Sequence, residues 1–237
     1  MEKMEMLYEG KAKKVFKTSN PELVLVEFKN DATAFNGQKK GQITGKGICN
    51  NKISSILFQL LEQNGISTHF VRQVSETEML VRKLEIIQVE VVVRNLAAGT
   101  LVKRIGLTEG QELEPPVLEF YYKNDALGDP LINNDHVFVL GLTKPEQLAL
   151  MSKIAHQVNR LLQEFFLERD LLLVDFKLEF GMAGQELLLG DEISPDTCRL
   201  WDRATRKKLD KDRFRQDLGE VAEAYQEVLR RLTNKTN

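Results

Sequence analysis

Hydrophobic positions in the first third of the chain alternate between strand-like and helix-like spacing. The runs at 23–28 ("LVLVEF"), 69–74 ("HFVRQV") and 79–87 ("MLVRKLEII") are rich in β-branched and aliphatic residues and predict strands. Between the first two runs, apolar residues recur at helical spacing, and Gly65 follows as a C-cap. This stretch predicts one helix, and its apolar positions are Ile53, Ile56, Leu57, Leu60 and Leu61.

The middle of the chain continues with extended patterns. "VEVVVRNLA" (89–97) and "VLEFYYKN" (117–124) predict strands, and "GTLVKRIG" between them predicts a short helix. Residues 124–141 are rich in Gly, Pro and Asn and predict a loop region. The change of pattern near residue 84 indicates an N-terminal β-rich domain of residues 1–84 and a C-terminal α/β domain of residues 85–237.

Two long amphipathic helices are predicted in the second half. Thr143 and Glu146 form a capping-box pattern with Pro145 in the first turn. The helix that follows has one apolar face, made of Leu148, Met151, Ala155, Val158, Leu161, Leu162 and Phe165. The C-terminal segment has the same spacing and predicts one further helix with an apolar face of Phe214, Leu218, Val221, Tyr225, Val228 and Leu232.

One predicted strand is apolar on one face and fully charged on the other. In "VDFKLEFG" (174–181) the apolar residues alternate with Asp175, Lys177 and Glu179. A second acidic segment, "GDEISPD" (190–196), follows shortly afterwards. A solvated strand face gives the same alternation, so the first segment alone favours charged residues that are simply exposed on the surface. With the second segment added, a functional site and a solvated face are equally good interpretations.

A tight turn of type II′ at 184–185 ("GQ") would fold the two acidic segments into a hairpin. Glu179 would then lie opposite Gly190 or Asp191, depending on whether the loop has two or three residues. Two carboxylates that close together need a cation between them. Oxygen ligands without His or Cys favour a hard ion such as Mg²⁺, whose remaining ligands are commonly phosphates. Lys177 on the same face could stabilise a developing negative charge.

Two basic segments near the N-terminus are candidates for phosphate binding. In "YEGKAKKVF", a turn at Gly10 is followed by Lys11 and Lys13 and could cover a polyphosphate, although an ordinary basic hairpin has the same pattern. The segment 37–47 ("GQKKGQITGKG") is not a P-loop, because its spacing is wrong and Gly47 stands where a Mg²⁺-binding Ser or Thr is needed. It is predicted to be a flexible loop that could gate a site.

Three arginines stand at polar ends of predicted strands or loops: Arg94, Arg199 and Arg215. Arginine is the side chain suited to bidentate capture of carboxylates and phosphates, although each of these could also be a surface residue. Glu90 lies on the same strand face as Arg94, so the two could form an internal ion pair instead. The three histidines are scattered without metal-ligand spacing, which favours structural roles.

Composition and charge exclude several classes of protein. The chain has 237 residues, 42% of them hydrophobic and 29% charged, which is typical of a soluble globular protein. Its net charge of −2 does not suggest a partner nucleic acid or membrane surface. Two cysteines without a CxxC pattern exclude a disulfide framework and indicate a reducing compartment. With no signal peptide and no run that could span a bilayer, the prediction is a cytoplasmic protein.

Motifs along the whole chain resemble those of the phosphoribosylaminoimidazole-succinocarboxamide synthase (SAICAR synthetase) family, bacterial type. The motifs that carry the resemblance are, in order, "LYEGKAKKVF", "VEVVVRNLAAGTLVKR", "YYKNDALGDPLIN", "VDFKLEFG", "GDEISPD" and "LWDRATRKKLDKDRFRQDLG". Two positions depart from the family pattern. Gln88 stands in place of a usual proline, and Thr100 in place of a usual serine, whose hydroxyl it keeps.

The resemblance implies an α+β fold with two domains and ATP bound in the cleft between them, as in ATP-grasp enzymes and kinases. The N-terminal domain would be an antiparallel sheet with a helix, and the larger one a mixed α/β domain. The implied reaction joins carboxyaminoimidazole ribonucleotide (CAIR) to L-aspartate with ATP and Mg²⁺, through an acyl phosphate, in purine biosynthesis. A homodimer is implied, with no nucleic-acid or membrane partner. Alternatives from the residues alone are a small-molecule kinase and a regulatory nucleotide-binding module.

The resemblance also implies roles for individual residues. The nucleotide site would contain Gly10, Lys11, Ala12, Lys13, Lys123, Glu179 and Asp191. Two of these would also hold the metal ion, namely Glu179 and Asp191. The imidazole substrate would be bound by Arg94, Thr100, Asp129, Lys177, Asp196, Arg199 and Arg215. The catalytic residues would be Lys177 and Asp175.

Overall fold

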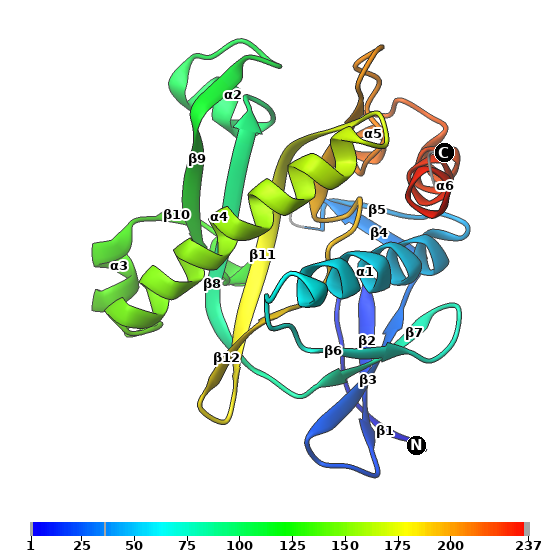
Figure 1. The fold of residues 1–237 in the computed structure, drawn as a ribbon, viewed down its shortest axis with the longest axis vertical. Helices are drawn as coiled ribbons and strands as arrows, with labels where there is room; N and C mark the ends of the chain where they lie inside the picture. Colours follow the sequence, from blue (N-terminus) through cyan, green and yellow to red (C-terminus); the bar gives the residue numbers. More distant parts are fainter. Residues whose placement is uncertain (1, 36, 235–237) are drawn as a thin grey trace.

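The computed structural model describes residues 2–35 and 37–234, which form two large antiparallel sheets and a two-stranded one, with helices packed on the large sheets (Figure 1). The first sheet has the strand order β1-β2-β3-β7-β6. Its strands are β1 (Lys3–Glu9), β2 (Lys13–Thr18), β3 (Leu23–Phe28), β7 (Glu78–Arg82) and β6 (Phe70–Gln73). These bounds agree with two of the predicted strands, 23–28 and 69–74.

One face of the first sheet is covered by helix α1 (Lys46–Gln63), which contacts β3, β6 and β7. The apolar residues predicted for this helix include its most buried side chains, and Ile53, Leu57 and Leu61 are fully buried. A two-stranded hairpin of β4 (Asp31–Ala34) and β5 (Lys39–Gln42) leads into the helix. The segment 37–47, predicted as a loop, therefore contains a strand, and a gating role for it stays a prediction.

The second sheet has the order β10-β9-β8-β11-β12, with β13 paired to β11. Its strands are β8 (Glu85–Leu96), β9 (Glu112–Tyr122), β10 (Leu131–Ile132), β11 (Leu171–Ala183), β12 (Glu186–Gly190) and β13 (Cys198–Asp202). Helix α4 (Pro145–Leu167) lies across this sheet and contacts β8 and β11 (Figure 1). Its predicted apolar face accounts for this packing, because Met151, Val158 and Leu162 are fully buried.

The β11–β12 hairpin settles the register that the sequence left open. Ala183 pairs with Glu186, so the loop has two residues and Glu179 lies opposite Gly190. Gly184 has a φ of 63°, as the first central position of a type II′ turn requires, and glycine adopts this φ without strain. Asp191 therefore stands one position beyond the residue that faces Glu179.

Two predicted elements are divided in the structure. The run 79–87 is not one strand, because β7 ends at Arg82 in the first sheet and β8 begins at Glu85 in the second. The predicted C-terminal helix is also two helices, α5 (Asp212–Arg215) and α6 (Val221–Thr233). Both predictions were wrong because the apolar spacing continues across a point at which the chain changes direction. In the second case the change of direction is made by residues with positive φ, namely Asp217, Gly219 and Glu220.

The start of helix α4 and the loop region before it also differ from the prediction. Lys144 is the N-cap, and the capping box joins it to Gln147, so the Thr143–Glu146 box is wrong. The region predicted as loop contains the short helices η1 (Asp125–Leu127) and α3 (Asn134–Val139). These helices are too short for the sequence to show a hydrophobic period. The predicted short helix is confirmed as α2 (Thr100–Ile105).

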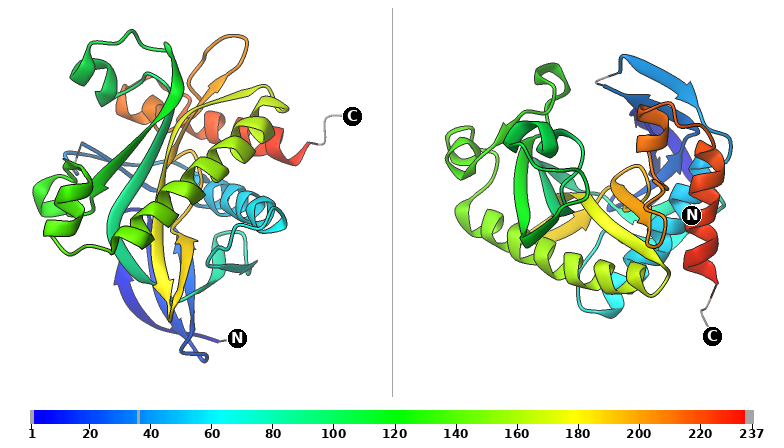
Figure 2. Two further views of the ribbon diagram at one scale, coloured as in Figure 1. Left: turned by 60° about the vertical axis from the view of Figure 1, so that its left-hand side comes forward. Right: turned by 90° about the horizontal axis from the view of Figure 1, so that it is seen from above.

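Both sheets share a continuous core. Buried side chains of α1, both sheets, α4 and α6 form a single cluster, and α6 packs against α1 although the two are far apart in sequence (Figures 1 and 2). The change from the first sheet to the second falls at 83–84, and a division into two domains at that point stays a prediction. Both cysteines, Cys49 and Cys198, are free and buried.

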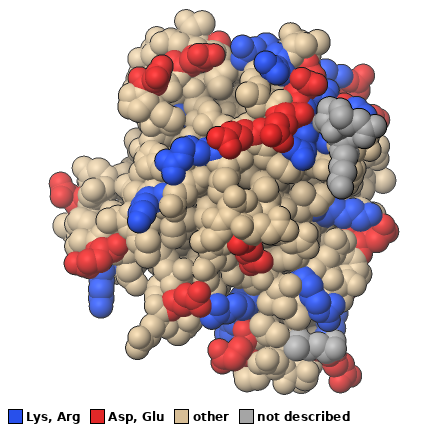
Figure 3. Space-filling model, viewed as in Figure 1, with Lys and Arg blue, Asp and Glu red and all other residues tan. Residues whose placement is uncertain are grey.

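Charged side chains on the face shown in Figure 3 are dispersed, with Lys and Arg interspersed among Asp and Glu and uncharged surface between them. This agrees with the small net charge of −2. Within the described residues, no helix is both long enough and apolar enough to cross a membrane.

Candidate active site

A cavity of about 540 Å³ is lined by elements of both sheets. The turn between β1 and β2, the β4–β5 hairpin, strands β8, β9 and β11, and the segments 191–199 and 211–215 contribute its walls. All the site residues predicted from the sequence line this cavity: Gly10, Lys11, Ala12, Lys13, Arg94, Thr100, Lys123, Asp129, Asp175, Lys177, Glu179, Asp191, Asp196, Arg199 and Arg215. None of the three histidines lines it.

Strand β11 carries the central charged residues of the cavity. Its alternation sends Phe176 and Leu178 into the core, both only 1% exposed, while Asp175 and Glu179 line the cavity. These two acids are 4% exposed, so the charged face is not a solvated strand face. Burying a carboxylate is costly unless cations or hydrogen bonds compensate it, so each acid needs partners.

Lysines compensate the acids at one end of the cavity. Lys177 Nζ donates to Glu90 Oε1 at 2.7 Å and to Glu179 Oε1 at 2.5 Å. Lys123 Nζ also donates to Glu179 Oε1, at 2.9 Å. Burial alone would lower the pKa of Lys177, but the carboxylates of Glu179 and Glu90 outweigh it and hold the pKa well above its ordinary value. Lys177 is therefore a permanent cation.

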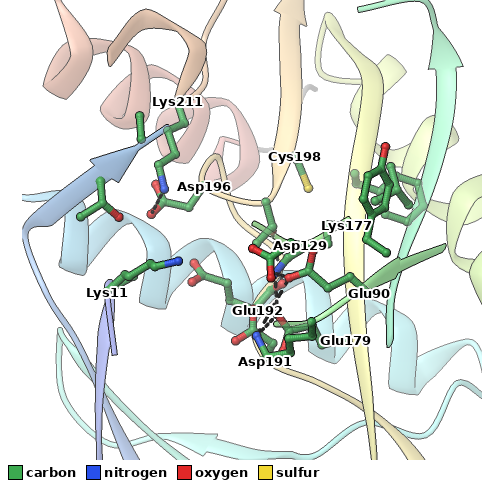
Figure 4. Close-up of a pocket in the computed structure, with 18 of the residues that line it drawn as sticks. Lys11, Glu90, Asp129, Lys177, Glu179, Asp191, Glu192, Asp196, Cys198 and Lys211 are labelled. Carbon is green, nitrogen blue, oxygen red and sulfur yellow. Dashed lines mark hydrogen bonds and ion pairs between the residues drawn. The ribbon is translucent and has the colours of Figure 1, made fainter. Parts of the chain in front are cut away.

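Lys13 completes this group from the opposite sheet. It follows the Gly10 turn, lies in β2 and forms ion pairs with Asp191 and, at 3.0 Å, with Glu192. These two acids outweigh burial and raise the pKa of Lys13, and the pKa of Asp191 is correspondingly low. We define the lysine end as this group of residues, namely Lys13, Lys123, Lys177, Glu90, Glu179, Asp191 and Glu192. Figure 4 labels Lys177 and the four acids of this group.

Arginines surround Asp175 at the other end. Arg94 Nη1 donates to Asp175 Oδ2 at 2.7 Å, and Arg94 Nε donates to Glu119 at 2.7 Å. Arg199 Nη1 donates to the same Asp175 oxygen at 2.8 Å. Gly99 has a φ of 59°, which favours glycine, and a side chain there would also place its Cβ 2.6 Å from Arg199 Nη2. Arg94 does not pair with Glu90, and the internal pair considered above is wrong.

Asp212 connects two of the arginines. Its Oδ2 accepts a hydrogen bond from Arg199 Nε at 2.8 Å, and its Oδ1 accepts one from Arg215 Nη1 at 2.5 Å. Asp210, fully buried, in turn accepts the backbone N–H of Asp212 at 2.7 Å and that of Leu200 at 2.8 Å. We define the arginine end as Arg94, Arg199, Arg215, Glu119, Asp175 and Asp212.

Asp196 is held by residues from three distant segments. Lys46 Nζ, at the start of α1, donates to Asp196 Oδ2 at 2.8 Å, and Tyr225 Oη, in α6, donates to Asp196 Oδ1 at 2.6 Å. Lys211 Nζ lies 3.6 Å from Oδ2. Burial is outweighed by Lys211 and Lys46, which keep the pKa of Asp196 well below its ordinary value. Asp196 therefore connects the cavity wall to helix α1 near the start of the chain and to helix α6 near its end.

The remaining predicted residues lie at the rim. Lys11 donates to Asp125 at 2.6 Å, and both side chains are largely exposed. Asp129 has a φ of 49° and accepts the backbone N–H of Asn124 at 2.8 Å, so it shapes the loop after β9. Thr100 is the first residue of α2, and it is an exposed residue of the cavity lining.

Whether Glu179 and Asp191 can hold a metal ion depends on the other ligands of that ion. No group of three or more His, Cys, Asp or Glu side chains is arranged to hold a metal ion in residues 2–35 and 37–234. Glu179 and Asp191 nevertheless stand at adjacent register positions and offer only carboxylate oxygens. Mg²⁺ commonly takes one or two protein carboxylates with phosphates and waters as its other ligands. The pair therefore fits a magnesium ion that arrives with a polyphosphate.

Sequence reasoning missed several residues that line this cavity, or that hold its lining residues in place. Asp212 and Lys211 lie in the "KLDKDRFRQD" stretch, from which only Arg215 was selected. Glu192 was overlooked beside Asp191. Lys46, only 1% exposed, was set aside together with the failed P-loop pattern. A buried lysine has no sequence signature, because its neighbours come from segments far away in the chain.

Comparison with known proteins agrees with this geometry. The profile of the SAICAR synthetase family matches residues 6–232. The chain belongs to the SAICAR synthetase family. The phosphoribosylaminoimidazole-succinocarboxamide synthase of Thermoanaerobacter sp. (strain X514) is 58% identical over 98% of this chain and 99% of that protein. The protein of the same name from Clostridium acetobutylicum is 57% identical over 99% of this chain and 100% of its own length.

Solved SAICAR synthetase structures share the fold. The enzyme from Ehrlichia chaffeensis superimposes with a TM-score of 0.95 at 46% identity, covering 98% of this chain and 100% of the other. A SAICAR synthetase solved in complex with ADP gives a TM-score of 0.93 at 47% identity, covering 98% and 99%. The α+β fold predicted from the resemblance is thereby confirmed.

Proposed function

We propose that this member of the family joins CAIR to L-aspartate and converts ATP to ADP and phosphate, forming SAICAR in purine biosynthesis. The observation that carries the proposal is a single cavity in which a lysine end and an arginine end lie along the same face of β11. The reaction needs one set of cations for a polyphosphate and another for a phosphorylated, carboxylated substrate. Membership of the family, with relatives of that name at 58% identity, supports the same reaction.

The lysine end is the proposed site of ATP. The Gly10 turn with Lys11, Ala12 and Lys13 would lie along the phosphates, and Lys123 would contact the nucleotide. The likeness to a family member solved in complex with ADP supports a nucleotide site in this chain. Glu179 and Asp191 would hold Mg²⁺, which when bound neutralises the charge of the phosphates and of the transferred phosphoryl group. Lys13 and Lys123, now paired with these acids, would turn to the phosphates.

The arginine end is the proposed site of CAIR. Arg94, Arg199 and Arg215 would bind its anionic groups, since planar guanidinium groups suit phosphate and carboxylate oxygens. Thr100, Asp129 and Asp196 complete the proposed substrate wall. The contacts of Asp175 with two arginines support a positioning role for it. Its carboxylate accepts hydrogen bonds from Arg94 and Arg199 and orients their guanidinium groups, so it is not a free carboxylate.

The chemistry needs an activated carboxyl group, because a carboxylate is a poor electrophile. Transfer of the γ-phosphoryl group to the CAIR carboxylate would give an acyl phosphate, which the amine of aspartate attacks with release of phosphate. Within the lysine end, Lys177 is the β11 residue nearest to Asp175 of the arginine end, and its raised pKa keeps it protonated. It is therefore suited to stabilise charge on the transferred group and not to accept a proton.

The reaction is tested by measuring ADP release with ATP, CAIR and L-aspartate, and by omitting each in turn. ADP release that needs all three compounds, with SAICAR detected by mass, is the expected result. ADP release without aspartate, together with a stable phosphorylated product, would instead identify a small-molecule kinase. Nucleotide binding with no turnover under any combination would identify a regulatory module.

The proposal includes a homodimer in the cytoplasm. The homodimer is proposed from the family resemblance, and the cytoplasmic compartment from the two buried, free cysteines. Light scattering during size-exclusion chromatography distinguishes a dimer from a single 27.1 kDa chain.

A further inference from the structure

Lys211 is a cation of the cavity whose ammonium group makes no hydrogen bond in the described part of the chain. It precedes α5, its side chain is 15% exposed, and Figure 4 shows it beside Asp196, across the pocket from Glu179 and Asp191. Its Nζ lies 3.6 Å from Asp196 Oδ2, which is an ion-pair distance beyond the normal length of a hydrogen bond.

Asp196 is already occupied by other donors. Lys46 and Tyr225 donate to its two oxygens at 2.8 Å and 2.6 Å. Burial lowers the pKa of Lys211, Asp196 offsets this only in part, and neighbouring Arg215 adds repulsion. A largely buried ammonium group with three donors and no acceptor is costly unless a ligand completes it.

The other lysines and arginines that line the cavity have acceptors. Lys13, Lys123 and Lys177 donate to acids of the lysine end, and Lys11 donates to Asp125. Each arginine of the arginine end donates to at least one carboxylate. Among the described lining residues, Lys211 therefore stands apart as a cation with its hydrogen-bonding capacity unused.

We propose that Lys211 binds a carboxylate group of the amino-acid substrate. This inference rests on the proposed function, in which a polyphosphate takes the lysine end and CAIR takes the arginine end. The amino acid brings two further carboxylates, and it must approach the activated carboxyl group from a side that neither other substrate fills. Lys211 lies on the wall opposite Glu179 and Asp191 of the lysine end (Figure 4). It is also close to Arg215, whose backbone N–H donates to the Lys211 carbonyl and whose Nε and Nη2 are without hydrogen bonds in the described residues.

Steady-state kinetics of Lys211→Met test the assignment. The KM for L-aspartate should rise by about 10-fold or more, because one charge-assisted hydrogen bond is lost, while the KM values for ATP and CAIR stay within about 2-fold. Lys207→Met is the matched control, since Lys207 is 52% exposed and pairs with Glu220. An unchanged KM for aspartate, or a larger rise in the KM for CAIR, overturns the assignment.

Shortened amines identify the carboxylate that is bound. L-Alanine and β-alanine each lack one of the two carboxylates of aspartate. In the wild type both amines should be poorer substrates than aspartate. In Lys211→Met, one of them should be as good a substrate as aspartate, and the other should remain poorer by the same factor as in the wild type. If both remain poorer than aspartate by the wild-type factors, Lys211 does not contact a carboxylate of the amino acid directly.

Equilibrium binding supplies a readout apart from turnover. Lys211→Gln should bind SAICAR about 10-fold more weakly than the wild type and bind CAIR with unchanged affinity, since only SAICAR carries the succinyl carboxylates. Equal weakening for both ligands would place Lys211 at the CAIR site. If the wild type makes SAICAR and the variants behave as the wild type does, only this inference fails. If the wild type shows no ADP release that depends on CAIR and aspartate, the proposed function fails with it.

Discussion

The two ends of the cavity use carboxylates in different ways. At the lysine end, one carboxylate serves two ammonium groups, as Glu179 does for Lys123 and Lys177. At the arginine end, planar guanidinium groups are held between two acids, as Arg199 is between Asp175 and Asp212. Lysine is a flexible point charge, whereas arginine has a fixed fork of donors.

The difference teaches how one cavity can serve two kinds of anion. Point charges on flexible stems can leave an acid when a metal ion and phosphates arrive, so the lysine end can exchange partners. An arginine fixed at Nε and Nη1 keeps its orientation and presents its other donors to a ligand of defined shape. The lysine end is therefore suited to transfer, and the arginine end to recognition. Four substitutions test this contrast, in order of decreasing expected effect.

Glu179→Gln should lower kcat by about 100- to 1,000-fold, because it removes a proposed metal ligand and the shared counter-charge of Lys123 and Lys177. The measurement is the ADP assay over a range of magnesium concentrations, in which the loss should be greatest at low magnesium. Glu186→Gln is the control, since Glu186 is 49% exposed on the paired strand. Near-normal activity of Glu179→Gln at limiting magnesium would show that Glu179 is not a magnesium ligand.

Asp212→Asn should raise the KM for CAIR by about 10- to 100-fold with little change in the KM for ATP. The buried carboxylate holds Arg199 and Arg215, and a neutral amide cannot accept from both with the same strength. The KM values for all three substrates decide the outcome, with Asp217→Asn as an exposed control. Equal rises for ATP and CAIR would show that the two ends do not act separately.

Arg215→Ala should raise the KM for CAIR by about 10-fold, less than Asp212→Asn does. Arg215 is 30% exposed and has one carboxylate partner, so its loss leaves Arg199 in place. The same kinetic series measures it. A KM for ATP that rises as much as that for CAIR would count against its role at the arginine end.

Asp210→Asn should change how stability depends on pH, with the smallest effect of the four. Burial, and next the charge of Asp212, raise the pKa of Asp210 to about 7 in the folded state. Between about pH 4 and pH 7 the folded chain holds a proton that the unfolded chain has released, so stability falls as the pH rises through this window. Relative to Asp210→Asn, the wild type should lose up to about 1 kcal/mol per pH unit between pH 5 and 7.

Urea unfolding at pH 5, 6, 7 and 8 measures this difference. Asp170→Asn is the control, because Asp170 is 78% exposed, and it should keep the slope of the wild type. Parallel pH profiles for the wild type and Asp210→Asn would show that Asp210 ionises as an ordinary carboxyl group in the folded chain.

The sequence predicted those parts of the fold that depend on local periodicity. The alternation around Lys177 located β11, and the glycine at 184 located its turn, because side-chain direction and turn geometry are local properties. The C-terminal helix was predicted as one element because the spacing around Leu218 continues the pattern of α6. Whether a chain turns there depends on what it packs against, which periodicity does not record.

The site was predicted unevenly for a similar reason. Residues in quoted motifs, such as Lys13 and Asp191, were selected through the family resemblance, and the structure gathers them in one cavity. Lys46 and Asp212 were not selected, because their importance lies in partners 150 and 13 positions away. Burial and partnership of ionised groups are properties of the folded chain, and a single sequence does not display them.

The hydrogen bond from Tyr225 to Asp196 has a consequence for how the protein is made. A ribosome delivers the first sheet early and helix α6 last, and domains begin to fold as they emerge. The wall that carries Asp196 gains its Tyr225 partner only after nearly the whole chain has been synthesised. The Gly10 turn is therefore synthesised long before the wall at Asp196 has all its partners, and Lys13 finds its own partners, Asp191 and Glu192, only in the last quarter of the chain.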